Sequence, residues 1–377
     1  MAACGTVQVT RRAALVVALA AALAAALSAA SSSVPAQQRQ ASDPPATRYS
    51  LVHGCYEVRS PGSRQQLAPG AGPFRMQAAA LGVYLLYGRD ASYLTDPGSG
   101  VPQPAGTASA AAEWRVTGTA AKGFRITNLA TGRGWSVSFA PVTGCAAYPE
   151  AQVDAAGASF TGASPEAGVL GTVEGHAHVT AFEFFGGDWH CGAPWSPYGA
   201  PYALPPSCAD KQQGTNGQVE EFVDWGGQPR PSDMQGWPVF KEWPSPTALA
   251  EEGDYYTGIQ RAWKAGLRLM VTNLVDNEAL CNIMTTRHNP CNDMAAVHIQ
   301  DRDLHALQDY IDAQSGGPGK GWFRLVTDPF QARRLRGVLK GKDNERLRTR
   351  GGGLRQARGH QRQTQHEADE GLQASRL

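Results

Sequence analysis

The first part of the chain, from residue 49 to about residue 165, is a series of short runs rich in β-branched and aromatic residues. Gly, Pro, Asp and Asn separate the runs, which is the punctuation expected between β-strands and turns. The pattern therefore predicts an all-β domain over residues 49–165. Four runs have the composition of strands, at residues 55–59, 83–87, 114–116 and 124–128.

Two segments of this domain share a pattern. Residues 124–137 consist of two β-prone runs around a Thr-Gly turn, and residues 74–87 are a looser version of the same arrangement. The first segment resembles a repeat of β-trefoil carbohydrate-binding modules, although a small β-sandwich would have a similar pattern. The resemblance implies one candidate function, an extracellular glycan-binding module without catalysis.

From about residue 168 the pattern changes to strands that alternate with helices. Apolar positions at helical spacing mark the helices, and Gly residues end them. Strands alternating with helices predict a parallel sheet or barrel over residues 168–335. The expected strands are residues 169–184, 267–275 and 322–326, and the expected helices are residues 248–265 and 294–314.

The N-terminal residues have the order of a secretory signal. Arg11 and Arg12 precede an apolar run of Ala, Val and Leu at residues 13–30, and small residues follow. This order predicts a signal peptide over residues 1–30, with a membrane anchor as the alternative. No other segment is apolar enough to cross a bilayer. We therefore expect a secreted or extracytoplasmic protein with no stable membrane span after cleavage.

Two further segments lack the composition of a folded core. Residues 31–48 are rich in Ser, Gln, Pro and Ala and predict a disordered linker. Residues 336–377 contain eight Arg and two Lys against five acidic residues, and predict a disordered Arg-rich tail. A basic arm for nucleic acid is the alternative for this tail, but export and a net charge of only +1 for the whole chain argue against a nucleic-acid partner.

The cysteine count fits export. Six cysteines follow the predicted signal, and an even number in an exported chain indicates disulfides. Sequence alone allows 15 pairings of six cysteines. Proximity along the chain favours the pairs Cys191–Cys208 and Cys281–Cys291, and Cys55 and Cys145 bracket the first domain.

The candidate chemistry lies in the sequence Gly171-Thr-Val-Glu-Gly-His-Ala-His178. Residues two apart on a strand point to the same face, so His176 and His178 are expected to project together. Two neutral imidazoles at this spacing are typical ligands of a divalent metal, most often zinc. The alternative is a pair of half-exposed strand histidines with no metal.

A resemblance supports the metal interpretation. His176-Ala-His178, the segment from Phe184 to Trp195, residues 266–270 and the segment from Asp309 to Trp322 are together similar to exported actinobacterial proteins of the metal-dependent hydrolase (amidohydrolase-like) superfamily. The resemblance implies a TIM barrel with one or two divalent ions, in which a metal-activated water attacks an amide or ester-type bond.

This chain departs from the family pattern because it has too few strand–helix units for a complete barrel. Only three strand–helix units precede the Arg-rich tail, so we expect both the barrel and its ligand set to be incomplete. Such a protein is expected to be inactive through truncation, or to associate with a partner. His360 and His366 lie in the tail without a strand context.

Four further residues are candidates for substrate binding, and no catalytic residue is assigned. Asp188 and His190 lie in a Trp-rich loop, and Asn273 and Asp276 follow a predicted strand. Ends of barrel strands and the loops beyond them carry active sites in TIM barrels. The alternative is that these residues end a turn or a strand. The expected substrate is a small molecule, a glycan or a peptide.

Overall fold

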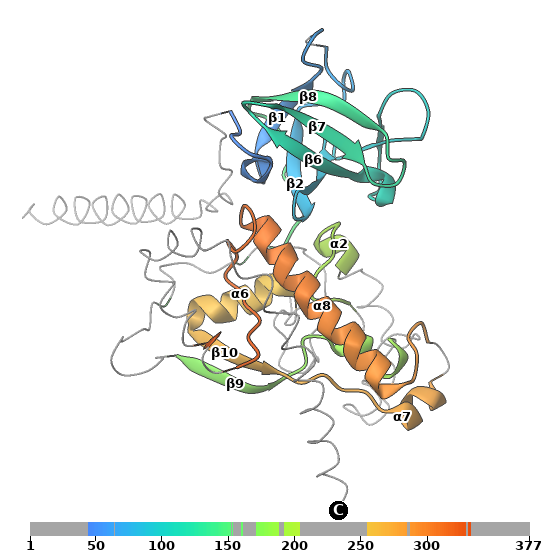
Figure 1. Cartoon of the computed structure of the whole chain (residues 1–377), viewed down its shortest axis with the longest axis vertical. Helices are drawn as coiled ribbons and strands as arrows, with labels where there is room; N and C mark the ends of the chain where they lie inside the picture. The colour runs from blue at the N-terminus through green and yellow to red at the C-terminus, as the bar shows by residue number, and fades with distance from the viewer. Residues whose placement is uncertain are drawn as a thin grey trace, which may run out of the picture. The chain divides into compact units, whose positions relative to one another are not determined.

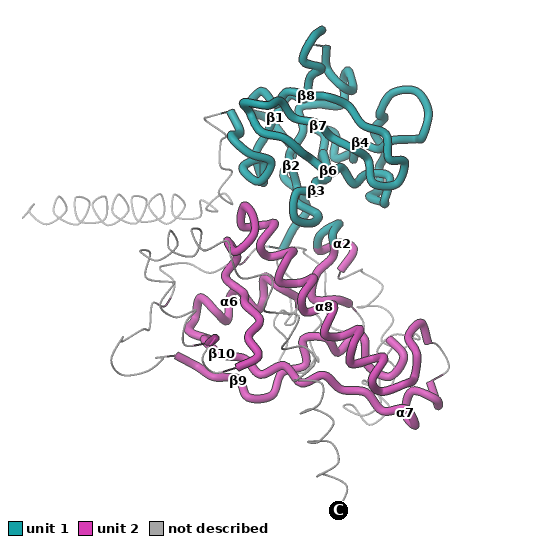
Figure 2. The backbone as a smooth tube through the Cα atoms, in the orientation of Figure 1, with its two compact units in different colours: residues 1–152, 197–199 teal, residues 153–196, 200–377 magenta. Residues whose placement is uncertain are grey.

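The computed structural model describes residues 44–63, 65–151, 153, 160, 171–187, 192–203, 255–284, 287–328 and 331–332. The chain divides into two compact units: unit 1 comprises residues 1–152 and 197–199, and unit 2 comprises residues 153–196 and 200–377 (Figure 2). The predicted signal peptide and the Arg-rich tail lie outside the described residues, as does most of the predicted linker. No helix within the described ranges is long and apolar enough to cross a membrane.

Unit 1 contains a closed antiparallel β-barrel of six strands with two additional strands (Figure 1). The barrel order is β1-β8-β7-β6-β3-β2, and β4 and β5 continue the sheet beyond β3. The strands are β1 (Cys55–Arg59), β2 (Phe74–Ala80), β3 (Val83–Tyr87), β4 (Tyr93–Thr95), β5 (Gln103–Ala105), β6 (Glu113–Thr119), β7 (Gly123–Asn128) and β8 (Gly134–Pro141). Two 3-10 helices accompany them, η1 (Arg48–Leu51) and η2 (Ala110–Ala112).

The barrel closes because β2 pairs on both sides. Tyr56 of β1 lies opposite Phe74 of β2, and Met76 of β2 lies opposite Leu86 of β3. β1 also pairs with β8. The prediction of a small sandwich was therefore wrong, because one sheet closes on itself. The trefoil-like prediction was wrong because the eight strands do not divide into three similar repeats around the barrel. The two segments with a shared pattern form the hairpins β2–β3 and β7–β8, and a hairpin pattern does not specify how hairpins assemble.

Alternating side chains fill the barrel. Trp114 and Ile126 are fully buried on neighbouring strands, and the indole N–H of Trp114 donates to the carbonyl of Leu94 at 2.7 Å. β3 is buried on both faces. Its outer face packs against Tyr93 and Tyr148, so the apolar run at residues 83–87 is covered outside the barrel as well as inside.

Unit 2 is built from a two-stranded parallel sheet and helices (Figure 1). The strands β9 (Thr172–Ala177) and β10 (Leu267–Thr272) pair in parallel. The helices are η3 (Ala181–Gly186), α2 (Ala200–Ala203), α6 (Tyr256–Ala265), α7 (Glu278–Ile283) and α8 (Asp293–Gln314).

The predicted TIM-barrel-like domain was wrong, even as an incomplete barrel. Within the described residues of unit 2 only β9 and β10 pair, and residues 322–326 do not form a strand. Trp322 stacks on Trp263 at 5.8 Å between ring centroids, and the amide of Leu325 donates to the side chain of Gln308 in α8. Side-chain packing and a side-chain hydrogen bond thus take the place of a sheet partner. The predicted strand 267–275 is also shorter, since β10 ends at Thr272, and it is half-exposed.

The long helix was predicted closely. α8 spans Asp293–Gln314, and Asn292 caps it by accepting a hydrogen bond from the amide of Ala295. α6 ends at Gly266, whose φ of 126° is readily adopted only by glycine. The first part of the helix predicted at residues 248–265 lies outside the described residues.

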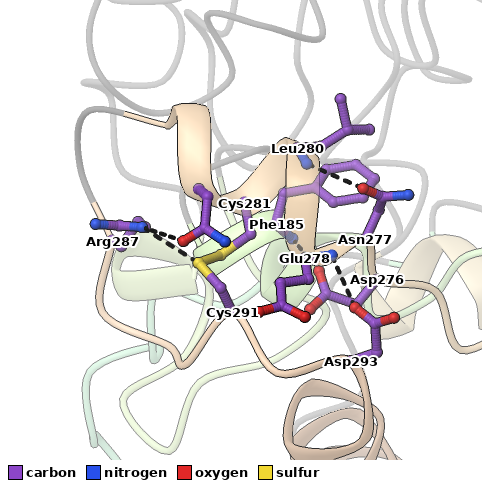
Figure 3. The surroundings of a disulfide bond; sticks show 10 residues. Phe185, Asp276, Asn277, Glu278, Leu280, Cys281, Arg287, Cys291 and Asp293 are labelled. Atoms are coloured by element: carbon purple, nitrogen blue, oxygen red, sulfur yellow. Dashed lines mark hydrogen bonds between the residues drawn. A yellow bond between two sulfur atoms is a disulfide. The ribbon is translucent and has the colours of Figure 1, made fainter.

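The described residues form two disulfides, Cys55–Cys145 in unit 1 and Cys281–Cys291 in unit 2, and both had been predicted. Figure 3 shows the second, which joins α7 to the loop before α8, with the guanidinium of Arg287 donating to Sγ of Cys291 at 3.3 Å. Cys191 and Cys208 lie outside the described residues. Two disulfides are typical of a protein that folds in an oxidising compartment.

Candidate functional site

The described candidate residues all lie toward the carboxyl ends of β9 and β10. His176 is near the end of β9 and His178 follows it, while Asn273 and Asp276 follow β10. The amide of Asn273 donates to the carbonyl of Ala177 at 2.9 Å, which extends the parallel pairing to the end of both strands. Because the strands are parallel, their carboxyl ends meet at one edge of the sheet. The fold therefore places these four residues along the same edge.

His176 and His178 project together, as the strand spacing predicted. Their Nε2 atoms lie 3.0 Å apart, and their ring centroids lie 4.7 Å apart. His176 is exposed, whereas His178 is half-buried and meets the ring of Phe184 edge-on at 5.3 Å. The carboxylate of Glu174 accepts from the amide of His176 at 2.9 Å. One ring is therefore held by packing and the other is open to solvent.

The separation of the two imidazoles fits a shared cation. Two zinc–nitrogen bonds of about 2.0–2.1 Å at a tetrahedral angle place the nitrogens about 3.3 Å apart. A hydrogen bond between two neutral rings is the other arrangement that a 3.0 Å separation allows. No group of three or more His, Cys, Asp or Glu side chains suited to a metal occurs among the described residues. The part of the chain described by the structure thus supplies two nitrogen ligands.

The second nitrogen of His178 distinguishes the two arrangements. Nδ1 of His178 is buried and has no hydrogen-bond partner among the described residues. A histidine that binds a cation through Nε2 carries its proton on Nδ1 and usually donates it to an acceptor. A neutral ring that donates through Nε2 to His176 instead leaves a lone pair on Nδ1, which is less costly to leave unpaired. Without a cation, the ring–ring hydrogen bond with His178 as donor is therefore favoured.

Asp276 holds the loop that follows β9. One carboxylate oxygen accepts from the amide of Phe185 at 3.0 Å, and the other is buried without a partner in the part of the chain that the structure describes. Burial raises the pKa of Asp276 above its ordinary value. Phe185 has a φ of 48°, in the left-handed region that non-glycine residues rarely adopt. The contact supports a structural role for Asp276 in fixing η3, and no described contact brings its carboxylate to the histidine pair.

Gln300 of α8 is a residue that the sequence analysis missed. It is fully buried, and its side-chain oxygen accepts from the hydroxyl of Thr180 at 3.2 Å and from the amide of Val275 at 3.1 Å. Its side-chain nitrogen donates to the carbonyl of Val275 at 2.7 Å. One amide thus joins the loop after β9 to the loop after β10. The available signal was a polar residue at helical spacing between Val297 and Leu304 on the apolar stripe of α8.

A carboxyl pair links η3 to α8. The side chains of Glu183 and Asp303 are hydrogen-bonded to each other, Asn289 donates to Glu183, and Arg302 donates to Asp303 at 3.0 Å. Burial, followed by the hydrogen bond with Asp303, raises the pKa of Glu183 to about 7. A bond between two carboxyl groups requires a proton on one of them, so Glu183 holds this proton below neutral pH.

We expect unit 2 to lose stability as the pH rises through about 7. The ordinary pKa of Glu183 is 4.5, so between these values the folded chain retains a proton that the unfolded chain has released. Its contribution to stability is complete below about pH 4.5 and is lost as the pH rises through about 7. The measurement is the thermal unfolding midpoint between about pH 5 and pH 8.

Two variants make this expectation specific to the carboxyl pair. Glu183→Gln should remove much of the decrease in the midpoint, because its amide keeps the hydrogen bonds without ionising. Asp309→Asn, at an exposed acidic residue on the same helix, should leave the decrease unchanged. An unaltered pH dependence in Glu183→Gln would contradict the assignment.

The remaining candidates lie outside the described ranges, and two other histidines lie on α8. Asp188 and His190 lie outside these ranges, as do His360 and His366 of the tail. His305 is exposed on α8, with its ring 3.6 Å from the carboxylate of Asp301 one turn earlier, and His298 is exposed on the same helix. These two helical histidines are not brought to the sheet edge by any described contact.

Comparison with known proteins adds no relative: no family model, no curated protein and no solved structure matches the chain.

Proposed function

We propose that the protein is an exported metal-dependent hydrolase-like protein in which His176 and His178 hold a divalent cation, with zinc the best fit for two imidazoles. The observation that carries the proposal is the 3.0 Å separation of the two Nε2 atoms at the carboxyl ends of a parallel strand pair. Two disulfides and the signal-like N-terminus support export and a secreted or extracytoplasmic location.

The proposed chemistry is hydrolysis of an amide or ester-type bond. A divalent cation supplies Lewis acidity and lowers the pKa of water, which generates a nucleophile at neutral pH. Packing against Phe184 would orient the imidazole of His178, and the exposed His176 would complete the pair on the solvent side. Gln300 would keep the two loops at this edge in register. Asn273, which follows β10 at this edge, would contact the substrate.

We expect the purified protein to contain zinc, and His176→Ala combined with His178→Ala to lose it. Two of the nitrogen ligands would be removed, and a cation site depends on each of its ligands. The measurement is metal content by mass spectrometry after dialysis against buffer that contains trace zinc, followed by titration with zinc.

The matched control is His298→Ala combined with His305→Ala, which removes two exposed histidines from α8. This variant should bind zinc as the wild-type protein does. Equal zinc in the wild type and in the variant that lacks His176 and His178 would refute the ligand assignment. The ring–ring hydrogen bond would then account for the short distance.

A further inference from the structure

The outer face of the unit 1 barrel carries a row of polar side chains centred on Arg125. Alternation along β7 places Phe124 and Ile126 inside the barrel, so Arg125 points outward. Thr117 of β6 and Ser136 of β8 lie directly opposite Arg125 in the two neighbouring strands. Strands are about 4.8 Å apart, so the row is about 10 Å long.

The guanidinium group of Arg125 lies over Gly134. A Cβ atom at Gly134, in the adjacent strand β8, would lie 2.6 Å from Nη2 and 2.9 Å from Cζ of Arg125. The group therefore lies over a position that only glycine leaves open. Arg125 makes no side-chain hydrogen bond or ion pair within the described part of the chain. Its five N–H donors are therefore open to solvent and have no acceptor among the described residues.

A hollow of about 340 Å³ surrounds this row. Lys122, in the β6–β7 turn, contributes a second cation to its wall, and Ser136 contributes a hydroxyl group. Pro61 and the edge of Phe124 supply apolar surface, and no carboxylate is among the lining residues. Two cations without a countercharge attract an anion. A guanidinium group binds planar oxyanions through two parallel hydrogen bonds.

We propose that this hollow binds the oxyanion groups of an acidic polysaccharide, with Arg125 as the principal donor and Lys122 and Ser136 as its companions. Carboxylate and sulfate groups share the required chemistry. A polymer fits better than a free ion, because the row lies on an open outer surface across three strands and a chain can run along it. The site lies in unit 1 and is independent of the histidine pair in unit 2.

The test measures binding of the full-length protein to dextran sulfate and to polygalacturonate, with neutral dextran as the negative control, at low and at moderate ionic strength. We expect binding to at least one of the two polyanions, none to dextran, and weaker binding as salt is added. The polyanion that binds identifies the charged group as sulfate or carboxylate.

Three variants separate a built site from diffuse surface charge. Arg125→Ala should weaken binding about tenfold or more, since hydrogen bonds between charged groups contribute about 1.5–3 kcal/mol. Arg89→Ala removes the same charge from the exposed β3–β4 turn, outside the hollow, and should have little effect. Gly134→Ala keeps every charge but displaces the guanidinium, and should weaken binding several-fold. The added methyl group meets only the mobile end of Arg125, so the barrel should still fold.

Several results would overturn the proposal. One is an equal loss of binding in Arg89→Ala and Arg125→Ala, which would show that net charge alone is sensed. Another is full binding in Gly134→Ala with an unchanged unfolding midpoint. The third is the absence of binding to both polyanions at low ionic strength.

Discussion

Replacing Cys55 and Cys145 by alanine is expected to lower the free energy of unfolding of unit 1 by about 4–5 kcal/mol. The disulfide joins residues 90 positions apart, and closing a loop of this length removes much conformational entropy from the unfolded chain. Both cysteines are only half-buried, so the substitutions leave little empty volume in the barrel core. The measurement is urea-induced unfolding followed by circular dichroism and by calorimetry.

A reducing agent provides the matched control for this prediction. It should lower the stability of the wild-type barrel to that of the double variant, and it should not lower the stability of the barrel in the variant any further. A barrel equally stable with and without the bond would show that the unfolded chain is already compact, and the entropic argument would not hold for this unit.

Trp114→Ala is expected to lower the stability of unit 1 by about 3–5 kcal/mol, which is the range for loss of a large buried aromatic side chain. Trp114 is fully buried and packs against Trp135, with 5.5 Å between ring centroids. The variant would also leave the buried carbonyl of Leu94 without its donor. Trp114→Phe keeps most of the volume and should lose about 1–3 kcal/mol, largely for the missing hydrogen bond.

The control for the tryptophan series is Val101→Ala, at a side chain that is 60% exposed in the same unit. It should change the stability by no more than about 0.5 kcal/mol. The comparison uses urea unfolding midpoints with a common slope. A loss in Trp114→Ala as small as that in Val101→Ala would mean that the barrel collapses to fill the cavity.

The sequence predicted local elements of unit 1 better than their assembly. The runs at residues 55–59, 83–87 and 124–128 are the strands β1, β3 and β7, because β-propensity and flanking turn residues act over a few positions. Closure depends on β2 lying between β1 and β3 and on β1 meeting β8. Pairing between distant strands leaves no periodicity in the sequence, so neither a sandwich nor a trefoil could be distinguished from a barrel.

In unit 2 a local apolar run was misleading. Residues 322–326 have the composition of a strand, yet Trp322 finds a stacking partner in Trp263 and Leu325 is bonded by Gln308. These contacts come from two helices that lie far apart in sequence. The same limit applies to the candidate site. The convergence of His176 and His178 follows from the two-residue period of a strand, whereas the role of Gln300 depends on Thr180 and Val275, which no local pattern connects.

The pairing of β1 with β8 determines the order in which unit 1 can form. Val58 lies opposite Phe139, so this contact must bring together two ends of a long segment, while hairpins such as β2–β3 and β6–β7 need only short loops. The entropy of that closure has to be lost before the contact contributes to stability, which makes it slow compared with hairpin formation. During synthesis, β1 therefore cannot pair with β8 until nearly the whole of the barrel has been synthesised.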